Sequence, residues 1–390
     1  MISIINRSVP RVAYSLKGAR QFSSLFAAKN SYTFQLPESS FDLHKLQEGP
    51  SFEVTATKDE LINMYKEMVL VRRMEMTSDG LYKAKLIRGF CHLCTGQEAV
   101  GVGMEKAISD KDQVITAYRC HGFTYMRGAS IKGILAELLG RVDGVSYGKG
   151  GSMHMFTPNF MGGNGIVGAQ VPVGAGMAFA QWYNNKAECT FALYGDGASN
   201  QGQVFEAYNM AKLWNLPCIF VCENNKYGMG TAASRSSAST EYYTRGDYIP
   251  GIRVNGMDIL AVREAVRFAR DYAISGKGPL VMEMVTYRYG GHSMSDPGTT
   301  YRSREEIQNM RSNNDPITGI KNRILDNSIA TEAELKEIDK EARKVVDEAA
   351  AEAKASPEPN LENFWNDVYA PGTEPKFLRG RDPTEIKYFN

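Results

Sequence analysis

The 390-residue sequence contains no apolar run that approaches the ~20 residues needed to cross a bilayer. It also lacks a charge imbalance, because 45 basic and 44 acidic residues leave a formal net charge of +1. A neutral balance gives no electrostatic reason to expect binding to nucleic acid or to a membrane surface. The sequence therefore predicts no membrane insertion and no nucleic-acid partner, and its length allows one large domain or two.

Cysteine is scarce and shows no disulfide framework. The six cysteines are spread along the chain, which fits a reducing compartment. Cys91 and Cys94 form a C-x-x-C pair, but no second pair follows it. Zinc sites of this type need four ligands, so the pair does not predict a zinc or redox site.

Acidic residues are absent from the first 37 positions, where arginine, lysine and serine are frequent. This composition is typical of a mitochondrial transit peptide, and a disordered basic arm is the alternative. The stretch ARQFSS at 19–24 resembles a matrix-processing site, with cleavage near Phe22 and Ser23. We assign residues 1–22 to the transit peptide and 23–56 to an N-terminal arm, and we expect the mature protein in the mitochondrial matrix.

Strand and helix patterns alternate along the rest of the chain. A capping box at Thr57 and Glu60 opens one helix. This alternation predicts an α/β fold with a mostly parallel sheet flanked by helices, over residues 57–356. Residues 357–390 are read as an irregular tail, and the glycine-rich stretch 144–168 as a loop. Further elements are expected as strands at 112–118 and 280–289 and as helices at 131–140, 258–276 and 332–355.

The stretch YGDGASNQG, residues 194–202, joins an apolar strand at 189–194 to a helix at 203–214. A second buried strand at 218–222 then leads into Asn225. Strand–helix–strand units close right-handed and parallel, so Asp196 and Asn225 should lie at the same edge of the sheet, where ligands bind. A carboxylate and a carboxamide suit Mg²⁺ holding a phosphorylated compound. The alternative is a turn that Asp196 merely caps.

Other polar residues also follow the carboxyl ends of predicted strands. Arg119 and His292 do so, together with Asp196 and Asn225, and four such residues at one edge indicate a site. His92 and His292 stand in glycine-flanked turns and are the candidate catalytic residues. An imidazole can donate a hydrogen bond to a diphosphate or to a developing oxyanion.

The stretch GNGIVG, residues 163–168, matches the dinucleotide fingerprint G-x-G-x-x-G. That fingerprint requires a strand before it and an acidic residue at the end of the next strand. The preceding MHMFTPNFMG is no convincing strand, and Glu188 comes before the following strand. We therefore reject a nicotinamide site, and expect these glycines to serve close packing against a neighbour or a cofactor.

Several motifs together carry a family resemblance. Gly-Asp-Gly, 26 residues and Asn-Asn resemble the thiamine diphosphate signature. With RGFCHL, ITAYRCHGF, GKGGSMHM, GGNGIVGAQVP, ENNKYGMGT and YRYGGHSMSDPG in order, residues 33–380 resemble the α subunits of mitochondrial pyruvate dehydrogenases. The resemblance implies the thiamine diphosphate-binding fold, with thiamine diphosphate and Mg²⁺ as cofactors.

The resemblance also implies partners and a reaction. A β subunit would complete the cofactor site in an α2β2 heterotetramer, and pyruvate would be decarboxylated. The acetyl group would pass to the lipoyl domain of dihydrolipoyl acetyltransferase, yielding acetyl-CoA in the full complex. The sequence offers no candidate glutamate for activating the aminopyrimidine, which the family takes from its β chain.

The resemblance assigns roles to individual residues. Mg²⁺ would be held by Asp196, Asn225 and the backbone carbonyl of Tyr227. The backbones that would cradle the cofactor belong to Gly165, Val167, Gly197 and Ala198. The residues that would contact the diphosphate or reach the reacting centre are His92, Tyr118, Arg119 and His292.

Phosphorylation sites are also implied, in a loop rich in small residues that we expect to be mobile and at the surface. Ser293 matches the principal inactivating site and Thr300 a second, which implies a regulatory kinase and phosphatase. Two positions depart from the pattern. Gly290 replaces a loop histidine, and Ala232 replaces a third regulatory serine, with Ser234 close by.

Two further interpretations stay open. An α subunit of a branched-chain 2-oxoacid dehydrogenase would share these motifs and take a bulkier substrate. A non-catalytic scaffold subunit loaded with cofactor is the second, although Asp196, Asn225, His92 and His292 together favour an enzyme.

Overall fold

The structure is a computed structural model that describes residues 31–389. The expected transit peptide, residues 1–22, and the first part of the expected arm lie outside the described residues. Among the residues that are described, no helix combines the length and the apolar character needed to cross a membrane.

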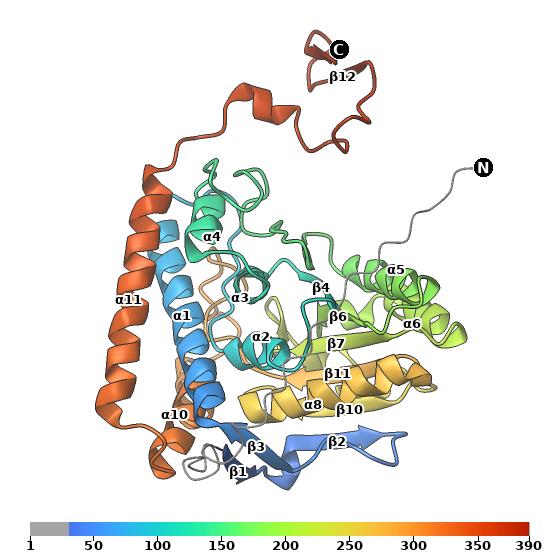
Figure 1. Ribbon diagram of the computed structural model, residues 1–390, viewed down its shortest axis with the longest axis vertical. Helices are drawn as coiled ribbons and strands as arrows, with labels where there is room; N and C mark the ends of the chain where they lie inside the picture. The colour runs from blue at the N-terminus through green and yellow to red at the C-terminus, as the bar shows by residue number, and fades with distance from the viewer. Residues whose placement is uncertain (1–30, 390) are drawn as a thin grey trace, which may run out of the picture.

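A seven-stranded sheet forms the centre of the molecule (Figure 1). All neighbours in it run parallel, except that β2 pairs antiparallel with β10 at one edge. This confirms the predicted α/β class with a mostly parallel sheet. The strands, in spatial order, are β2 (Phe41–His44), β10 (Gly251–Asn255), β11 (Leu280–Val285), β7 (Cys218–Asn224), β6 (Thr190–Gly195), β4 (Gln113–Ala117) and β5 (Phe160–Asn164).

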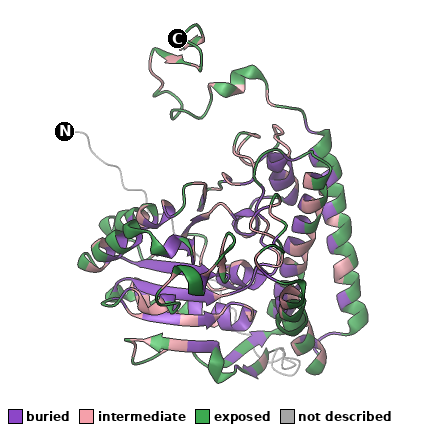
Figure 2. Ribbon diagram, turned by 180° about the vertical axis from the view of Figure 1, so that it is seen from behind, coloured by how far each residue is buried: buried purple, intermediate pink, exposed green. Residues whose placement is uncertain are grey.

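The sheet is buried on both faces. Along β6, Phe191 and Leu193 belong to one hydrophobic cluster, whereas Ala192 and Tyr194 belong to another. Successive side chains of a strand point to opposite faces, so the two clusters are the two layers between sheet and helices. Figure 2 shows the central strands almost wholly buried. This explains why they read as continuous apolar runs in the sequence.

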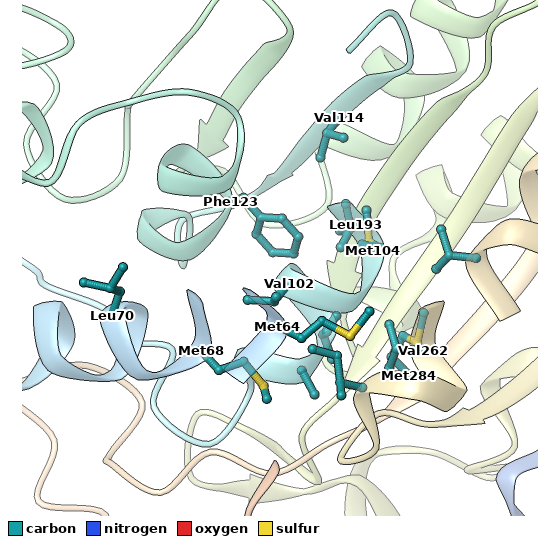
Figure 3. Packing of buried hydrophobic residues seen from close by; sticks show 14 of the residues in the cluster. Met64, Met68, Leu70, Val102, Met104, Val114, Phe123, Leu193, Val262 and Met284 are labelled. Atoms are coloured by element: carbon teal, nitrogen blue, oxygen red, sulfur yellow. The ribbon is translucent and has the colours of Figure 1, made fainter. Parts of the chain in front are cut away.

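Helices cover each face of the sheet. The second cluster lies under α5 (Gln170–Tyr183) and α6 (Gly202–Leu213). Figure 3 shows part of the first, which includes Met64 and Met68 of α1 and Val262 of α8. The helices of the first cluster are α1 (Lys58–Lys83), α2 (Glu98–Glu105), α3 (His121–Met126), α4 (Ile131–Leu138), α8 (Ile259–Tyr272), α10 (Pro316–Asp326) and α11 (Glu332–Ala355).

The predicted helix starts are confirmed. The Thr57 hydroxyl accepts from the Glu60 N–H at 3.2 Å, and the Glu60 carboxylate accepts from the Thr57 N–H at 2.7 Å. Asp258 caps α8 through the N–H groups of Leu260 and Ala261. Such caps satisfy N–H groups that have no partner inside the helix.

The remaining elements are short. β1 (Ser31–Gln35) and β3 (Glu53–Thr57) pair antiparallel in a separate two-stranded sheet. β2, which lies between them in sequence, pairs with β10, so the expected arm contributes a strand to the central sheet. The tail after Pro357 stands away from the body and is mostly exposed (Figures 1 and 2). The other elements are β8 (Tyr227–Gly228), β9 (Thr231–Ala232), α7 (Ala233–Ser236), α9 (Arg304–Asn314), β12 (Phe377–Arg379) and β13 (Ile386–Tyr388), with short helices at Glu38–Ser40, Ala198–Asn200, Tyr242–Thr244, Ala273–Lys277 and Leu361–Phe364.

Two sequence expectations were wrong. The stretch 144–168 is not all loop, because β5 forms an edge strand against β4 within it. The expected strand at 280–289 ends as β11 at Val285. The Thr286 N–H still donates to the Asn224 carbonyl of β7, but the backbone then turns away from the sheet. The Tyr289 N–H donates to the Thr95 carbonyl, and the Arg302 guanidinium donates to the carbonyls of Arg288 and Tyr289.

The order of the strands creates a crevice. From β4 the chain passes to β5 on one side, and from there α5 carries it to β6 on the other side of β4. The strand order reverses here, so the connections leave in opposite directions at the carboxyl ends of β4 and β6. Open α/β sheets bind their ligands at such switch points.

Candidate functional site

A cavity of about 950 Å³ opens at this switch point. Its wall combines the carboxyl ends of β4, β6 and β7 with the loops around residues 92, 165 and 292. The fold therefore brings all the site residues expected from the sequence to one place. These residues are His92, Tyr118, Arg119, Gly165, Val167, Asp196, Gly197, Ala198, Asn225, Tyr227, His292, Ser293 and Thr300.

Asp196 is a buried carboxylate with an unused oxygen. It directly follows β6 and is 2% exposed. Its Oδ2 atom has no hydrogen-bond partner among the described residues. Burial raises its pKa from 3.8 to about 6. Buried charges are normally paired or bound to metal ions, so this oxygen fits a cation that the polypeptide does not itself supply.

Asn225 and Tyr227 bring two further oxygens to the same wall. The Arg288 Nη1 atom donates to Asn225 Oδ1 at 3.1 Å and to the Tyr227 carbonyl at 3.2 Å. Each oxygen has two lone pairs, so one remains for another partner. A Cβ placed on Gly228 would lie 3.2 Å from Gly197 Cα and 3.9 Å from Asp196 Oδ2. The two loops thus touch, and the three oxygens form a hard set that fits Mg²⁺.

Two histidines and a tyrosine form an aromatic cluster in the wall. The His92 ring centroid lies 4.4 Å from that of Tyr118 and 5.3 Å from that of His292. Burial and the charge of Arg119 lower the pKa of His92 to about 2 and that of His292 to about 4. Both rings are therefore neutral at physiological pH, and both Nδ1 atoms are without partners in the described part of the chain.

Arg119 braces the loops that carry these histidines. Its guanidinium donates to the Leu93 carbonyl and, at 2.9 Å, to the His292 carbonyl. Arg119 is 7% exposed. The structure thus gives it a role in holding the two loops together, besides the place in the cavity wall that the sequence predicted.

The comparisons with known proteins agree with this geometry. The sequence model of the family described as "Dehydrogenase E1 component" matches residues 66–362. The chain belongs to the dehydrogenase E1 component family. This family is thiamine diphosphate-dependent, so the fold is the thiamine diphosphate-binding fold, as predicted.

Named relatives of this family are similar over most of the chain. The chain is 66% identical over 353 residues to "Pyruvate dehydrogenase E1 component subunit alpha, mitochondrial" of Saccharomyces cerevisiae, covering 90% of this chain and 84% of that protein. The Chaetomium thermophilum protein of the same name is 63% identical, covering 92% of this chain and 88% of its own length. The somatic form of Homo sapiens is 59% identical, covering 90% and 89%.

The loop of this family member that carries Ser293 folds onto the cavity. Asp296 holds it by accepting from the N–H groups of His292, at 2.6 Å, and Gly298, at 2.8 Å. Ser293 is 7% exposed, and its hydroxyl lies 2.8 Å from that of Ser295. The sequence predicted that this loop lies at the surface. That prediction is confirmed for Ser295 and Thr300, which are exposed, but it is wrong for Ser293, which is buried.

The glycine stretch 163–168 also differs from its expected context. A strand does lead into it, because β5 ends on its first two residues, and α5 follows it, so the missing strand was no ground for rejecting a dinucleotide site. The next strand, β6, even ends beside Asp196. However, β4 lies between β5 and β6, whereas the dinucleotide fold pairs these consecutive strands. The order of the strands in the sheet is therefore the reason to reject a dinucleotide site.

The C-x-x-C pair does not belong to a larger group of potential metal ligands in the described part of the chain. Cys91 and Cys94 are buried free thiols, and burial raises the pKa of both. Within residues 31–389 no group of three or more His, Cys, Asp or Glu side chains could hold a metal ion. The set of Asp196, Asn225 and the Tyr227 carbonyl is of a different kind, with a single carboxylate.

Sequence reasoning missed several polar residues of the cavity. Arg288 contacts the proposed metal ligands, and the Gln97 amide oxygen accepts from Asn225 Nδ2 at 3.2 Å. Gln170 and Glu223 also line the wall. Burial raises the pKa of Glu223 to about 7, so the cavity does contain a glutamate that the sequence reading overlooked. The position of Glu223 directly before Asn224 and Asn225 was the sequence feature that could have identified it as a site residue.

Proposed function

We propose that this chain is the catalytic α subunit of a mitochondrial pyruvate dehydrogenase. The enzyme would decarboxylate pyruvate with thiamine diphosphate and Mg²⁺ and pass the acetyl group to lipoyl groups of dihydrolipoyl acetyltransferase. The observation that carries the proposal is the unpartnered, buried Asp196 carboxylate beside Asn225 and the Tyr227 carbonyl in one switch-point cavity. High identity to relatives of that name supports the choice of reaction.

In this proposal the metal neutralises the diphosphate where the chain provides oxygen ligands. Mg²⁺ takes octahedral oxygen ligands and completes its shell with phosphate oxygens. Asp196 supplies the only charge among the three protein ligands, and Arg288 supports the other two. Gly197 and Ala198 follow Asp196 in the chain and line the cavity, as do Gly165 and Val167. These four residues would form the cradle of the cofactor.

The chain's own side chains would orient the reactants. When bound, thiamine diphosphate supplies the electron sink that decarboxylation of a 2-oxoacid requires. His92 and His292 are neutral, so each can donate one N–H to a cofactor or substrate oxygen. Tyr118 packs against both rings and would limit their movement. Holding cofactor and substrate in the reactive geometry lowers the activation free energy of decarboxylation without adding a chemical step.

A β subunit is proposed to close the cavity in an α2β2 heterotetramer. Phe90 and Met229 line the cavity and are each 62% exposed, and Val167 is 48% exposed. Large apolar side chains rimming a ligand site mark a surface that another chain covers. The β subunit would also provide the acid that activates the aminopyrimidine, and full activity of Glu223→Gln in the assembled enzyme would support that assignment over the cavity residue Glu223.

Regulation by a kinase and a phosphatase is part of the proposal. Ser293 lines the cavity next to His292, and Thr300 lines it further along the loop. A phosphate adds about −1.5 to −2 charges at neutral pH. On Ser293 this charge would lie close to the cofactor diphosphate, and its bulk would not fit the buried position. Repulsion and steric conflict would open the loop and block access of the lipoyl group.

A matrix location completes the proposal. The relatives of the chain are named mitochondrial proteins. The acid-free first 37 residues have the composition of a targeting segment.

The test is turnover by the chain co-expressed with its cognate β subunit. Pyruvate-dependent reduction of a dye should require both thiamine diphosphate and Mg²⁺. The same preparation should turn over 3-methyl-2-oxobutanoate much more slowly. Faster turnover of the branched substrate would assign the chain to the branched-chain enzymes, and absence of turnover with either would favour the scaffold interpretation.

A further inference from the structure

His92 lies in a segment without regular secondary structure, which begins before it and extends to the start of α2. No strand or helix fixes its backbone, yet its ring is 5% exposed and packs against Tyr118 and His292. Side chains from other parts of the chain must therefore hold this segment in place.

Three buried residues from separate elements provide that support. His121, the first residue of α3, places its Nδ1 atom 2.9 Å from Glu75 Oε2 of α1 and its Nε2 atom 2.9 Å from Ser152 Oγ. The Ser152 hydroxyl accepts from the His92 N–H at 3.3 Å, and Glu75 Oε1 accepts from the Cys94 N–H at 2.9 Å. This chain of hydrogen bonds therefore begins at the backbone N–H of His92 and ends at the backbone N–H of Cys94.

We propose that Glu75, His121 and Ser152 form a positioning ring that fixes the backbone of residues 92–94 and thereby holds the His92 imidazole in the cavity. The claim that this matters for catalysis rests on the proposed function. The ring itself does not, because it is built from contacts within this chain.

The protons can be placed so that each bond in the ring has one donor. In one such arrangement, His121 donates from Nδ1 to the Glu75 carboxylate and accepts at Nε2 from the Ser152 hydroxyl. The Ser152 oxygen then accepts from the His92 N–H, and Glu75 has a second oxygen for Cys94. Buried polar networks are stable and rigid only when they are satisfied in this way.

The same three residue types occur in nucleophilic triads, in which an acid orients a histidine that activates a serine. Burial argues against that reading here. Glu75 and His121 are 0% exposed and Ser152 is 5% exposed, and it is the neighbouring Met153 that lines the cavity. A substrate would have no path to the Ser152 hydroxyl, whose oxygen is already bonded to His92.

Arg119 and the Ser293 loop depend on the same segment. The Leu93 carbonyl accepts from Arg119, and the Met294 N–H donates to the Cys91 carbonyl at 2.8 Å. A shift of residues 92–94 would therefore move both histidines of the site together. Small misplacements of this kind reduce rates by up to about a hundredfold.

The test compares Ser152→Ala and His121→Gln with two control variants in the assembled, cofactor-free enzyme. The controls are Ser78→Ala and Thr124→Val. These buried hydroxyls bond only to Met74 and Cys120 carbonyls one turn earlier, on the same helices as Glu75 and His121. Hydrogen–deuterium exchange of residues 92–94 should accelerate in the ring variants and stay unchanged in the controls. Unchanged exchange in Ser152→Ala would overturn the ring, whatever reaction the enzyme performs.

A double-mutant cycle then tests the link to catalysis. Ser152→Ala should lower kcat with pyruvate on the order of tenfold, and by a smaller factor when His92 is already alanine, with the remaining loss coming from the displacement of His292. The Ser78→Ala control should behave identically in both backgrounds. An equal loss in both backgrounds, or full activity of His92→Ala, would refute positioning through His92.

A second serine variant keeps the inference testable if Ser152→Ala does not assemble. If Ser152→Ala fails to assemble, the nearly isosteric Ser152→Cys, which keeps a weak donor, should give intermediate exchange and intermediate kcat. Wild-type levels of both in Ser152→Cys and His121→Gln would count against the ring. Failure of the wild-type enzyme to use pyruvate would refute the proposed function, while the exchange experiment would still decide on the ring.

Discussion

Replacing Asp196 with asparagine is expected to stabilise the cofactor-free protein and to abolish metal-dependent cofactor binding. The carboxylate is 2% exposed, and its Oδ2 atom has no hydrogen-bond partner within the described residues. Asparagine keeps the size of the side chain and one oxygen but carries no charge. The same substitution should therefore act in opposite directions on the empty and the loaded protein.

The magnitude follows from the pKa of Asp196, which burial raises from 3.8 to about 6. The pKa of this carboxyl group is higher in the folded than in the unfolded protein. Its contribution to stability is therefore fully present at pH values below the unfolded pKa, and it is lost as the pH rises through the folded pKa. The charged form then disfavours the fold by about 3 kcal/mol at pH 7.5 and by about 1 kcal/mol at pH 4.5. Asp196→Asn should recover up to that amount at pH 7.5 and less at pH 4.5.

Thermal unfolding of the assembled enzyme, dialysed against a chelator, measures both effects at one fixed protein concentration. Mg²⁺ and thiamine diphosphate at a hundredfold excess over Kd should stabilise the wild type by about 2.7 kcal/mol. Asp196→Asn should start from a higher Tm and show no rise with the cofactor.

Asp315→Asn is the matched control. Burial tends to raise the pKa of Asp315, but Arg72, at 3.0 Å, and the Thr318 N–H together hold it below its usual range. Its loss should lower the Tm and preserve the rise with cofactor. A lower Tm for cofactor-free Asp196→Asn would show that the carboxylate has a compensating partner. An unchanged rise with cofactor in that variant would refute the metal assignment.

Three further predictions concern the same cavity. Because protons compete with the metal at Asp196, the Kd of thiamine diphosphate with Mg²⁺ should rise about tenfold per pH unit below about pH 6, and a flat calorimetric profile from pH 5 to 8 would contradict this. Ser293→Glu should lower activity strongly, whereas Ser293→Ala should resist kinase and ATP; complete inactivation of Ser293→Ala would move the switch to Thr300 or Ser295. The chain purified without its partner should not decarboxylate pyruvate, and robust turnover would overturn a site shared between two subunits.

The sheet edge that carries the proposed metal ligands was predictable because its signals are local. β6 and β7 each end in their motif, and a single right-handed crossover makes them parallel neighbours. Asp196 and Asn225 must then lie at one edge, as the structure confirms. The capping box at Thr57 and the helix at 332–355 were predictable for the same reason, since residues close together in sequence determine them.

Features set by contacts distant in sequence were not predictable. β5 has the sequence FMGGN, whose two glycines give no strand signal, and only its pairing with β4 makes it a strand. Ser293 reads as a surface residue, but Asp296 and Arg302 fold its loop inward. The contact of Arg288 with Asn225 and the ring around His121 join residues from separate elements, which no local pattern specifies.

Anomalous diffraction from the assembled enzyme, crystallised with thiamine diphosphate and with Mn²⁺ in place of Mg²⁺, tests the central claim most directly. Mn²⁺ shares the preference of Mg²⁺ for octahedral oxygen ligands. The account predicts one peak at about 2.0–2.3 Å from an Asp196 carboxylate oxygen, Asn225 Oδ1 and the Tyr227 carbonyl, with the diphosphate completing the shell. A peak elsewhere, or a bound diphosphate with no metal at these three oxygens, would contradict it.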